Sequence, residues 1–216
     1  WTVSESTTLT ADTTVDALTV EEGVTLDHNG YKLYCTSLAG SGTITSSDIN
    51  LATPSGTVTS SPDTLYSSTT PQMLFDNDTG TRALLQKVNL PFAVTYDFGV
   101  GAEMTINKYK IYGPSSNATR GPKVWTLDGS TDGDVWTSLD TQSGVTWSNG
   151  QNKDFPFSNT SVYRYYRITI TDSSDTSTKF SGPFLELNEI QFFGPGELHV
   201  NVPADSVATV GSLTIS

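Results

Sequence analysis

The stretch FDNDTGTR, residues 75–82, holds two aspartates and several small or turn-forming residues between a phenylalanine and an arginine. Asp76, Asp78 and Thr81 offer carboxylate and hydroxyl oxygens, which Ca²⁺ takes together with backbone carbonyls in sets of about six to eight. The same residues are typical of an Asx turn, in which the two aspartates accept hydrogen bonds from local amides. The loop alone favours the turn, so a calcium site needs a further ligand from elsewhere in the chain.

The charge balance limits the partners. The chain has 23 acidic and 11 basic residues, which gives a formal net charge of −12. Binding to a nucleic-acid backbone requires a basic surface that this composition lacks, and an anionic membrane surface would repel the chain. We therefore expect neutral ligands and divalent cations, with no nucleic acid and no membrane insertion.

The location of the protein is predicted from general features of the sequence. The chain opens on WTVSES without Met or a signal sequence, and no stretch has the length of an apolar membrane-spanning helix. We expect part of a larger multidomain protein, secreted or at the cell surface, as the many Thr, Ser, Gly and Asn residues suggest. The single cysteine, Cys35, cannot form an internal disulfide and is expected in the core.

Short runs of Thr, Val, Ile, Tyr and Phe, broken by Gly, Asn, Asp and Pro, predict an all-β protein. Residues 1–55 contain evenly spaced short strands such as TVDALTV and YKLYCTSL, which are typical of β-solenoid coils. Residues 196–216 resume this pattern. We predict that the two ends form one solenoid-like structure and that residues 56–195 are a domain inserted into it.

The inserted domain has strand patterns of its own. In KVWTLDGSTDGDVWTSL, apolar alternation stops at a Gly, Ser and Asp turn and then resumes, which predicts a hairpin with Trp125 and Trp136 in the core. In YRYYRITIT, alternate residues differ in polarity, as in a strand with two unlike faces. Such strands predict one sheet packed on another.

Six segments of the middle occur in a characteristic order: FDNDTGTR, VTYDFG, INKYKIYG, RGPKVWTLDGSTDGDVWTSLD, YRYYRITIT and LELNEIQFFG. Together they resemble the discoidin or coagulation-factor C-type family, which includes the family 32 carbohydrate-binding modules. The resemblance implies a jelly-roll β-sandwich of the galactose-binding-like type, here flanked by the solenoid-like segments.

The resemblance also implies a structural calcium site, because in the family the matching loop binds a metal ion together with a glutamate of the last strand. By position the ligands would be Asp76, Asp78, Thr81, Glu189 and backbone carbonyls near Leu74 and Leu187. One departure is Ala83, which stands where the family often has an aromatic residue. The packing of the loop is therefore open.

Family 32 modules bind sugars with loops at one end of the sandwich, commonly through an Arg, an Asn or His, and an aromatic ring that lies against the pyranose. The corresponding candidates are Asn117, Arg120 and Trp147, with Tyr66, Lys87 and Phe180 as secondary ones. Each has an alternative reading: Arg120 as a partner of a surface carboxylate, Asn117 as a turn residue, and Trp147 as a lid folded onto the sandwich.

No catalytic signature accompanies these residues. His28 and His199 have no metal-ligand spacing, and the chain has no nucleophile elbow and no phosphate-binding glycine loop. We predict a non-catalytic, lectin-like module that binds a glycan or polysaccharide, with galactose-type glycans among the candidates. Two alternatives stay open: a structural or adhesive β-solenoid segment, in which Arg120 and Trp147 would lie apart, and an ancillary fragment of a polysaccharide-degrading enzyme.

Overall fold

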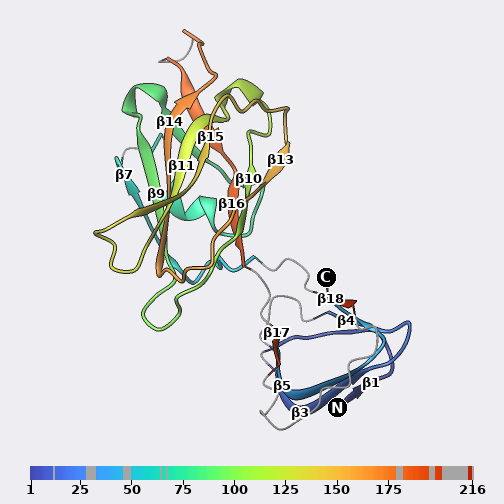
Figure 1. The fold of residues 1–216 in the computed structure, drawn as a ribbon. Helices are drawn as coiled ribbons and strands as arrows, with labels where there is room; N and C mark the ends of the chain where they lie inside the picture. The colour runs from blue at the N-terminus through green and yellow to red at the C-terminus, as the bar shows by residue number, and fades with distance from the viewer. Residues whose placement is uncertain are drawn as a thin grey trace. The chain divides into compact units, whose positions relative to one another are not determined.

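The computed structural model describes residues 1–11, 13–27, 33–45, 50–63, 65–66, 68–178, 182–194, 198–200 and 214–215. The chain forms two compact units, one from residues 1–49 and 194–216 and one from residues 50–193 (Figure 1). Across the described ranges, no helix has the length and apolar character needed to cross a membrane.

The first unit consists of two stacks of parallel strands. One stack has the order β1 (Thr2–Val3), β3 (Thr13–Val20), β5 (Leu33–Gly40) and β17 (Leu198–Val200), and the other β2 (Thr7–Thr8), β4 (Thr25–Asp27), β6 (Thr43–Thr45) and β18 (Thr214–Ile215). Because β17 pairs with β5 and β18 with β6, strands from both ends of the chain share each stack. The parallel strands agree with the solenoid interpretation, which stays a prediction.

The core of this unit is a row of aliphatic side chains, mainly Leu with Val and Ile. Parallel register places Leu18 opposite Leu38, so like residues lie above one another along the stack. Leu26, Leu33 and Ile44 have no exposed surface. Cys35 is buried among them, as predicted, and burial raises the pKa of its thiol.

The second unit is an antiparallel sandwich. Its five-stranded sheet has the order β12 (Thr137–Gln142), β11 (Pro122–Ser130), β14 (Tyr165–Ser173), β9 (Phe92–Asp97) and β7 (Thr57–Ser61). The other strands are β13 (Asn152–Pro156), β10 (Lys108–Tyr112) and β16 (Glu189–Phe193) in one sheet, and β15 (Phe184–Leu187) and β8 (Ala83–Gln86) in a pair. Three short 3₁₀ turns connect described strands: η1 (Pro71–Leu74), η2 (Lys87–Asn89) and η3 (Ala118–Arg120).

Alternation along the strands fills the space between the sheets. In β14, Tyr166, Ile168 and Ile170 point inward and are fully buried. Trp125 is also fully buried, as predicted, and its indole N–H donates to the Tyr109 hydroxyl at 2.9 Å. The all-β sandwich that the sequence predicts is therefore present, with a core rich in aromatic rings.

Trp136 does not lie in this core, and the prediction that placed it there is wrong. Its ring is only partly buried and packs beneath the guanidinium of Arg167, 3.9 Å from the ring centroid. The cause is a β-bulge: β12 pairs Asp140 with Leu127 but Ser138 with Asp128, so one extra residue intervenes. A one-residue shift turns the following side chains to the other face of the sheet.

Candidate functional site

The loop 75–82 begins where η1 ends, at the buried Phe75. The carboxylate of Asp76 accepts the amide N–H of Asp78 at 2.9 Å, and the carboxylate of Asp78 accepts the amide N–H of Gly80 at 2.8 Å. Asn77 between them has a positive φ of 60°, a conformation that Asn tolerates better than most residues. Both aspartates therefore make the Asx turns that the sequence offers as the alternative to a metal site.

The hydroxyl of Thr81 lies among more acceptors than it can satisfy. Its Oγ1 is 2.9 and 3.1 Å from the two carboxylate oxygens of Asp76, 2.8 Å from the carbonyl of Asp78 and 3.2 Å from the carbonyl of Met73. A hydroxyl has one proton and can donate to one of these oxygens at a time. The loop thus gathers several oxygen acceptors around this hydroxyl, two of which also accept backbone N–H groups, from Asp78 and from Thr81 itself.

Glu189, at the start of β16, joins this group from the other side. Its carboxylate is fully buried, and its Oε1 accepts the amide N–H of Asn77 at 3.2 Å. Its Oε2 is buried without a hydrogen-bond partner among the described residues. Burial first, and the nearby charge of Asp76, raise the pKa of Glu189 to about 8. A buried carboxylate in this position lacks a compensating positive charge.

The structure thus brings Asp76, Thr81 and Glu189 together, while the carboxylate of Asp78 turns to Gly80. The side chains of Leu74 and Leu187 are buried in the core, and the carbonyl that faces Thr81 is that of Met73, one residue before Leu74. Within the described ranges no group of three or more His, Cys, Asp or Glu side chains converges as metal donors. A cation here would depend on hydroxyl and carbonyl oxygens as well as carboxylates.

A second cluster surrounds β15. Arg120, the last residue of η3, donates from Nη1 to the Glu186 carboxylate at 3.2 Å, and its Nε lies 3.7 Å from the Asp175 carboxylate. Its guanidinium also lies over the ring of Phe184, 4.9 Å from the centroid. Arg82 contacts the other oxygen of Glu186 at 3.2 Å. Arg120 therefore does pair with carboxylates, although both are buried ones.

Two more predicted residues belong to this cluster. The ring of Tyr66 meets Phe184 edge to face at 5.4 Å between centroids and is 43% exposed. The ammonium of Lys87 lies 2.6 Å from the Asp172 carboxylate and 3.4 Å from the Asp175 carbonyl. Sequence reasoning missed Phe184, whose strand FLEL suggests only core packing. Phe180 lies outside the described residues.

Trp147 takes up its alternative role as a lid. Its indole N–H donates to the carbonyl of Pro122 at 2.8 Å, and its ring lies flat against the backbone of two glycines. A Cβ added at Gly121 would stand 2.2 Å from the ring, and one at Gly113 would stand 2.5 Å away. The tryptophan is thus held beside the loop that carries Arg120, with part of its surface still exposed.

Asn117 is exposed at the start of η3 and makes no side-chain hydrogen bond within the described part of the chain. The loop of Asn117 is connected to the loop that carries Trp147, because the side-chain oxygen of Asn149 accepts the amide N–H of Ala118 at 2.9 Å. Asn117 therefore keeps its amide available to solvent or to a ligand.

These features define an antiparallel β-sandwich of the jelly-roll class, with charged and aromatic side chains gathered around β15 and the adjoining η3 turn. The family model for the F5/8 type C domain matches residues 55–182, more than half of the chain. The chain belongs to this family. None of the curated proteins matches it significantly.

Several solved structures share the fold. A chitosan-binding module from a chitosanase/glucanase of Paenibacillus sp. IK-5 is 21% identical, with 68% of this chain and 99% of that chain covered and a TM-score of 0.51. A family 32 module of Clostridium perfringens NanJ, in complex with galactose, is 13% identical, with 68% and 99% covered and a TM-score of 0.54. Another module from C. perfringens, in complex with GalNAc-β-1,3-galactose, is 19% identical, with 68% and 100% covered and a TM-score of 0.51. The jelly-roll fold predicted from the sequence is confirmed.

Proposed function

We propose that residues 50–193 are a non-catalytic carbohydrate-binding module whose ligand contacts the loops around Arg120. The observation that carries this proposal is the fixed position of Arg120 over Phe184, the ring that also packs against the exposed Tyr66. Its guanidinium is held by Glu186, Asp175 and Phe184, and its side chain keeps 20% exposure. A guanidinium has five N–H donors, so donors remain for sugar hydroxyls after these contacts.

The aromatic component of the site is Tyr66. Its exposed ring packs edge-on against Phe184, which also lies beneath Arg120, so one buried ring positions both candidate contacts. Preorganised side chains lose little conformational entropy on binding. Asn117 and Trp147 flank the same loop and would extend the contact surface.

Among glycans, we favour neutral ligands of the galactose type. The net charge of −12 would attract cationic polymers without specificity, whereas it leaves neutral sugars to be selected by hydrogen bonds and ring contacts. Two of the structures that share the fold were determined with galactose or GalNAc-β-1,3-galactose. These complexes supply the first ligands to test.

We further propose a structural Ca²⁺ bound by Asp76, Thr81 and Glu189 with the carbonyls of Met73 and Asp78. The surplus of acceptors around Thr81 and the unpartnered Oε2 of Glu189 support it, because a cation would compensate both. The ion would have a structural role: it would hold loop 75–82 against β16 and would take no part in a reaction.

The parallel strands of the first unit favour a role for this module within a larger secreted or surface protein. In this proposal the stacked strands of β1, β3, β5 and β17 act as a solenoid-like support, and the sandwich is the binding element. Stacks of this kind grow by addition of further coils, which suits a stalk or an ancillary region of a larger enzyme.

The proposal is tested by calorimetric titration of the intact chain with galactose, GalNAc-β-1,3-galactose and chitosan oligomers. We expect Arg120→Lys to weaken sugar binding about tenfold or more, because a lysine cannot reproduce the fixed guanidinium donors. Arg164→Lys is the matched control, since Arg164 pairs with Asp97 at 2.7 Å near the opposite end of β14. Equal binding by both variants and the parent chain would refute the assignment of Arg120.

A further inference from the structure

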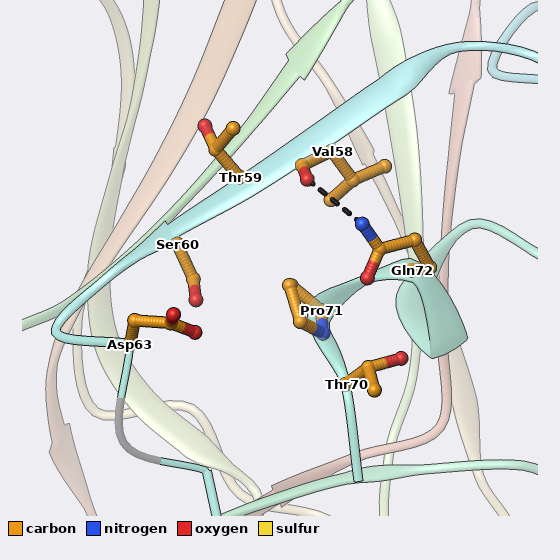
Figure 2. A pocket seen from close by; sticks show the side chains of 7 residues that line it. All are labelled: Val58, Thr59, Ser60, Asp63, Thr70, Pro71 and Gln72. Atoms are coloured by element: carbon orange, nitrogen blue, oxygen red, sulfur yellow. Dashed lines mark hydrogen bonds between the residues drawn. The ribbon is translucent and has the colours of Figure 1, made fainter.

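A separate cavity of about 460 Å³ opens between strand β7 and the η1 turn (Figure 2). Its lining comes from Val58, Thr59, Ser60, Asp63, Thr70, Pro71 and Gln72, none of which belongs to the predicted sites. Pockets that hold small molecules have volumes of about 300–1,000 Å³. The cavity is therefore large enough for one sugar-sized ligand.

The polar groups of this cavity are largely unused by the protein. The Ser60 hydroxyl oxygen is buried and has no hydrogen-bond partner among the described residues. Figure 2 shows the Ser60 hydroxyl and the Asp63 carboxylate pointing into the space in front of Pro71. Buried polar atoms are nearly always paired in folded proteins, so an unpaired one that faces a cavity indicates a missing partner.

The backbone contributes as well, because β7 is the edge of the five-stranded sheet. The Gln72 side-chain amide donates to the Val58 carbonyl at 3.1 Å, which shows that the Val58 backbone faces away from β9. Backbone direction repeats every second residue, so the Ser60 backbone also faces away from β9. The same hydrogen bond uses one N–H of the Gln72 side-chain amide and leaves the second N–H as a donor and the amide oxygen as an acceptor.

We propose that this cavity is a second saccharide-binding site, which takes a single polyhydroxylated sugar residue. Hydroxyls on Ser60 and Thr70 both donate and accept, while the Asp63 carboxylate accepts from two neighbouring sugar hydroxyls. A divalent cation would need more anionic oxygens than the single carboxylate of Asp63. The ring of Pro71 provides an apolar surface for the C–H groups of the pyranose. The lining of this site shares no residue with the cluster around Arg120.

The test is a titration of the ¹⁵N-labelled intact chain with the methyl glycosides of galactose, glucose and N-acetylglucosamine, followed by amide NMR shifts. We expect at least one glycoside to give saturable shifts at Ser60, Asp63 and Gln72. Ser60→Ala and Asp63→Asn should each weaken that binding about tenfold, because each removes a hydrogen-bonding group from the cavity. Asp134→Asn, which alters an exposed carboxylate in the β11–β12 turn, is the control and should leave it unchanged.

The outcomes separate the two sites. Shifts at Arg120 and Tyr66 without shifts around Ser60 would overturn the second site and leave the proposed function standing. Shifts around Ser60 alone would support the second site and count against the site at Arg120. Absence of shifts around Ser60 with all three glycosides, or shifts that persist in both cavity variants, would overturn the proposal. Ser60→Ala removes an unpaired buried hydroxyl and should not impair folding.

Discussion

Glu186 in β15 and Glu189 in β16 are both fully buried, but the fold gives them different partners. Glu186 binds two guanidinium groups, those of Arg82 and Arg120, each at 3.2 Å. Glu189 receives one backbone N–H, lies near the like charge of Asp76, and keeps one oxygen unpaired within the described residues. The first carboxylate is compensated by the chain itself, whereas the second is not.

The two buried glutamates differ in what compensates their negative charge. At Glu186 the chain supplies its own cations, and the carboxylate holds the guanidinium of Arg120 in place. In the proposed function, this contact fixes Arg120 for binding a ligand. At Glu189 the neighbours are the Asn77 amide and oxygen atoms, and burial raises the pKa of the carboxyl to about 8, which favours its neutral, protonated form. A bound Ca²⁺ would replace that proton.

The largest expected effect comes from removing both cations of Glu186. The double variant Arg82→Ala/Arg120→Ala leaves a buried carboxylate without a counter-charge, which should lower the free energy of unfolding by about 3–5 kcal/mol. Urea denaturation measures the change. Adding Glu186→Gln to the double variant should restore a large part of the loss, because the buried charge is removed. A loss below about 1 kcal/mol would show that Glu186 is not compensated by these arginines.

Calcium should have the next largest effect on stability, and this effect should depend on Glu189 and not on Glu186. If the proposed site binds Ca²⁺, an ion concentration one hundred times the dissociation constant stabilises the folded state by about 2.7 kcal/mol. We expect a higher melting temperature in Ca²⁺ than in EDTA for the parent chain, and no difference for Glu189→Gln. Glu103→Gln, at an exposed acid away from the loop, is the control and should respond like the parent. An unchanged response of Glu189→Gln would remove Glu189 from the site.

Much of the fold could be predicted because it depends on local patterns. The alternation around Trp125 gave the β11–β12 hairpin, and that of YRYYRITIT gave β14, which spans Tyr165–Ser173. The resemblance to a family related the loop 75–82 to Glu189, more than a hundred residues away. Each inference used either periodicity or a known pairing of segments.

The remaining features depend on tertiary contacts that periodicity does not encode. The bulge that turns Trp136 outward adds one residue to a regular alternation, and nothing in KVWTLDGSTDGDVWTSL marks its position. Trp147 becomes a lid because Gly113 and Gly121 leave room beneath its ring, although they are distant from it in sequence. Likewise, the sequence shows that Glu186 exists but not that two arginines converge on it.

The pH dependence of stability provides a more selective test of Glu189, with an effect that is smaller per pH unit but accumulates over the range. Its folded pKa of about 8 exceeds its ordinary value of 4.5, so its stabilising contribution is complete below 4.5 and is lost as the pH rises toward 8. In EDTA, the unfolding free energy of the parent relative to Glu189→Gln should therefore fall by up to about 1.4 kcal/mol per pH unit in this range. Saturating Ca²⁺ should abolish the decrease. A flat difference in EDTA would mean that Glu189 is ionised at neutral pH.

The smallest effect is expected from Arg82→Ala alone. Arg82 is 43% exposed in its side chain, against 20% for Arg120, and solvent weakens an ion pair of this kind. Because Arg120 still neutralises Glu186, we expect a loss of about 1 kcal/mol or less in the free energy of unfolding. Sugar binding should change little, since Arg120 keeps its contacts with Asp175 and Phe184. A loss in this variant as large as that of the double variant would mean that Arg82, rather than Arg120, compensates the buried glutamate, and that the carboxylate does not position the proposed ligand contact.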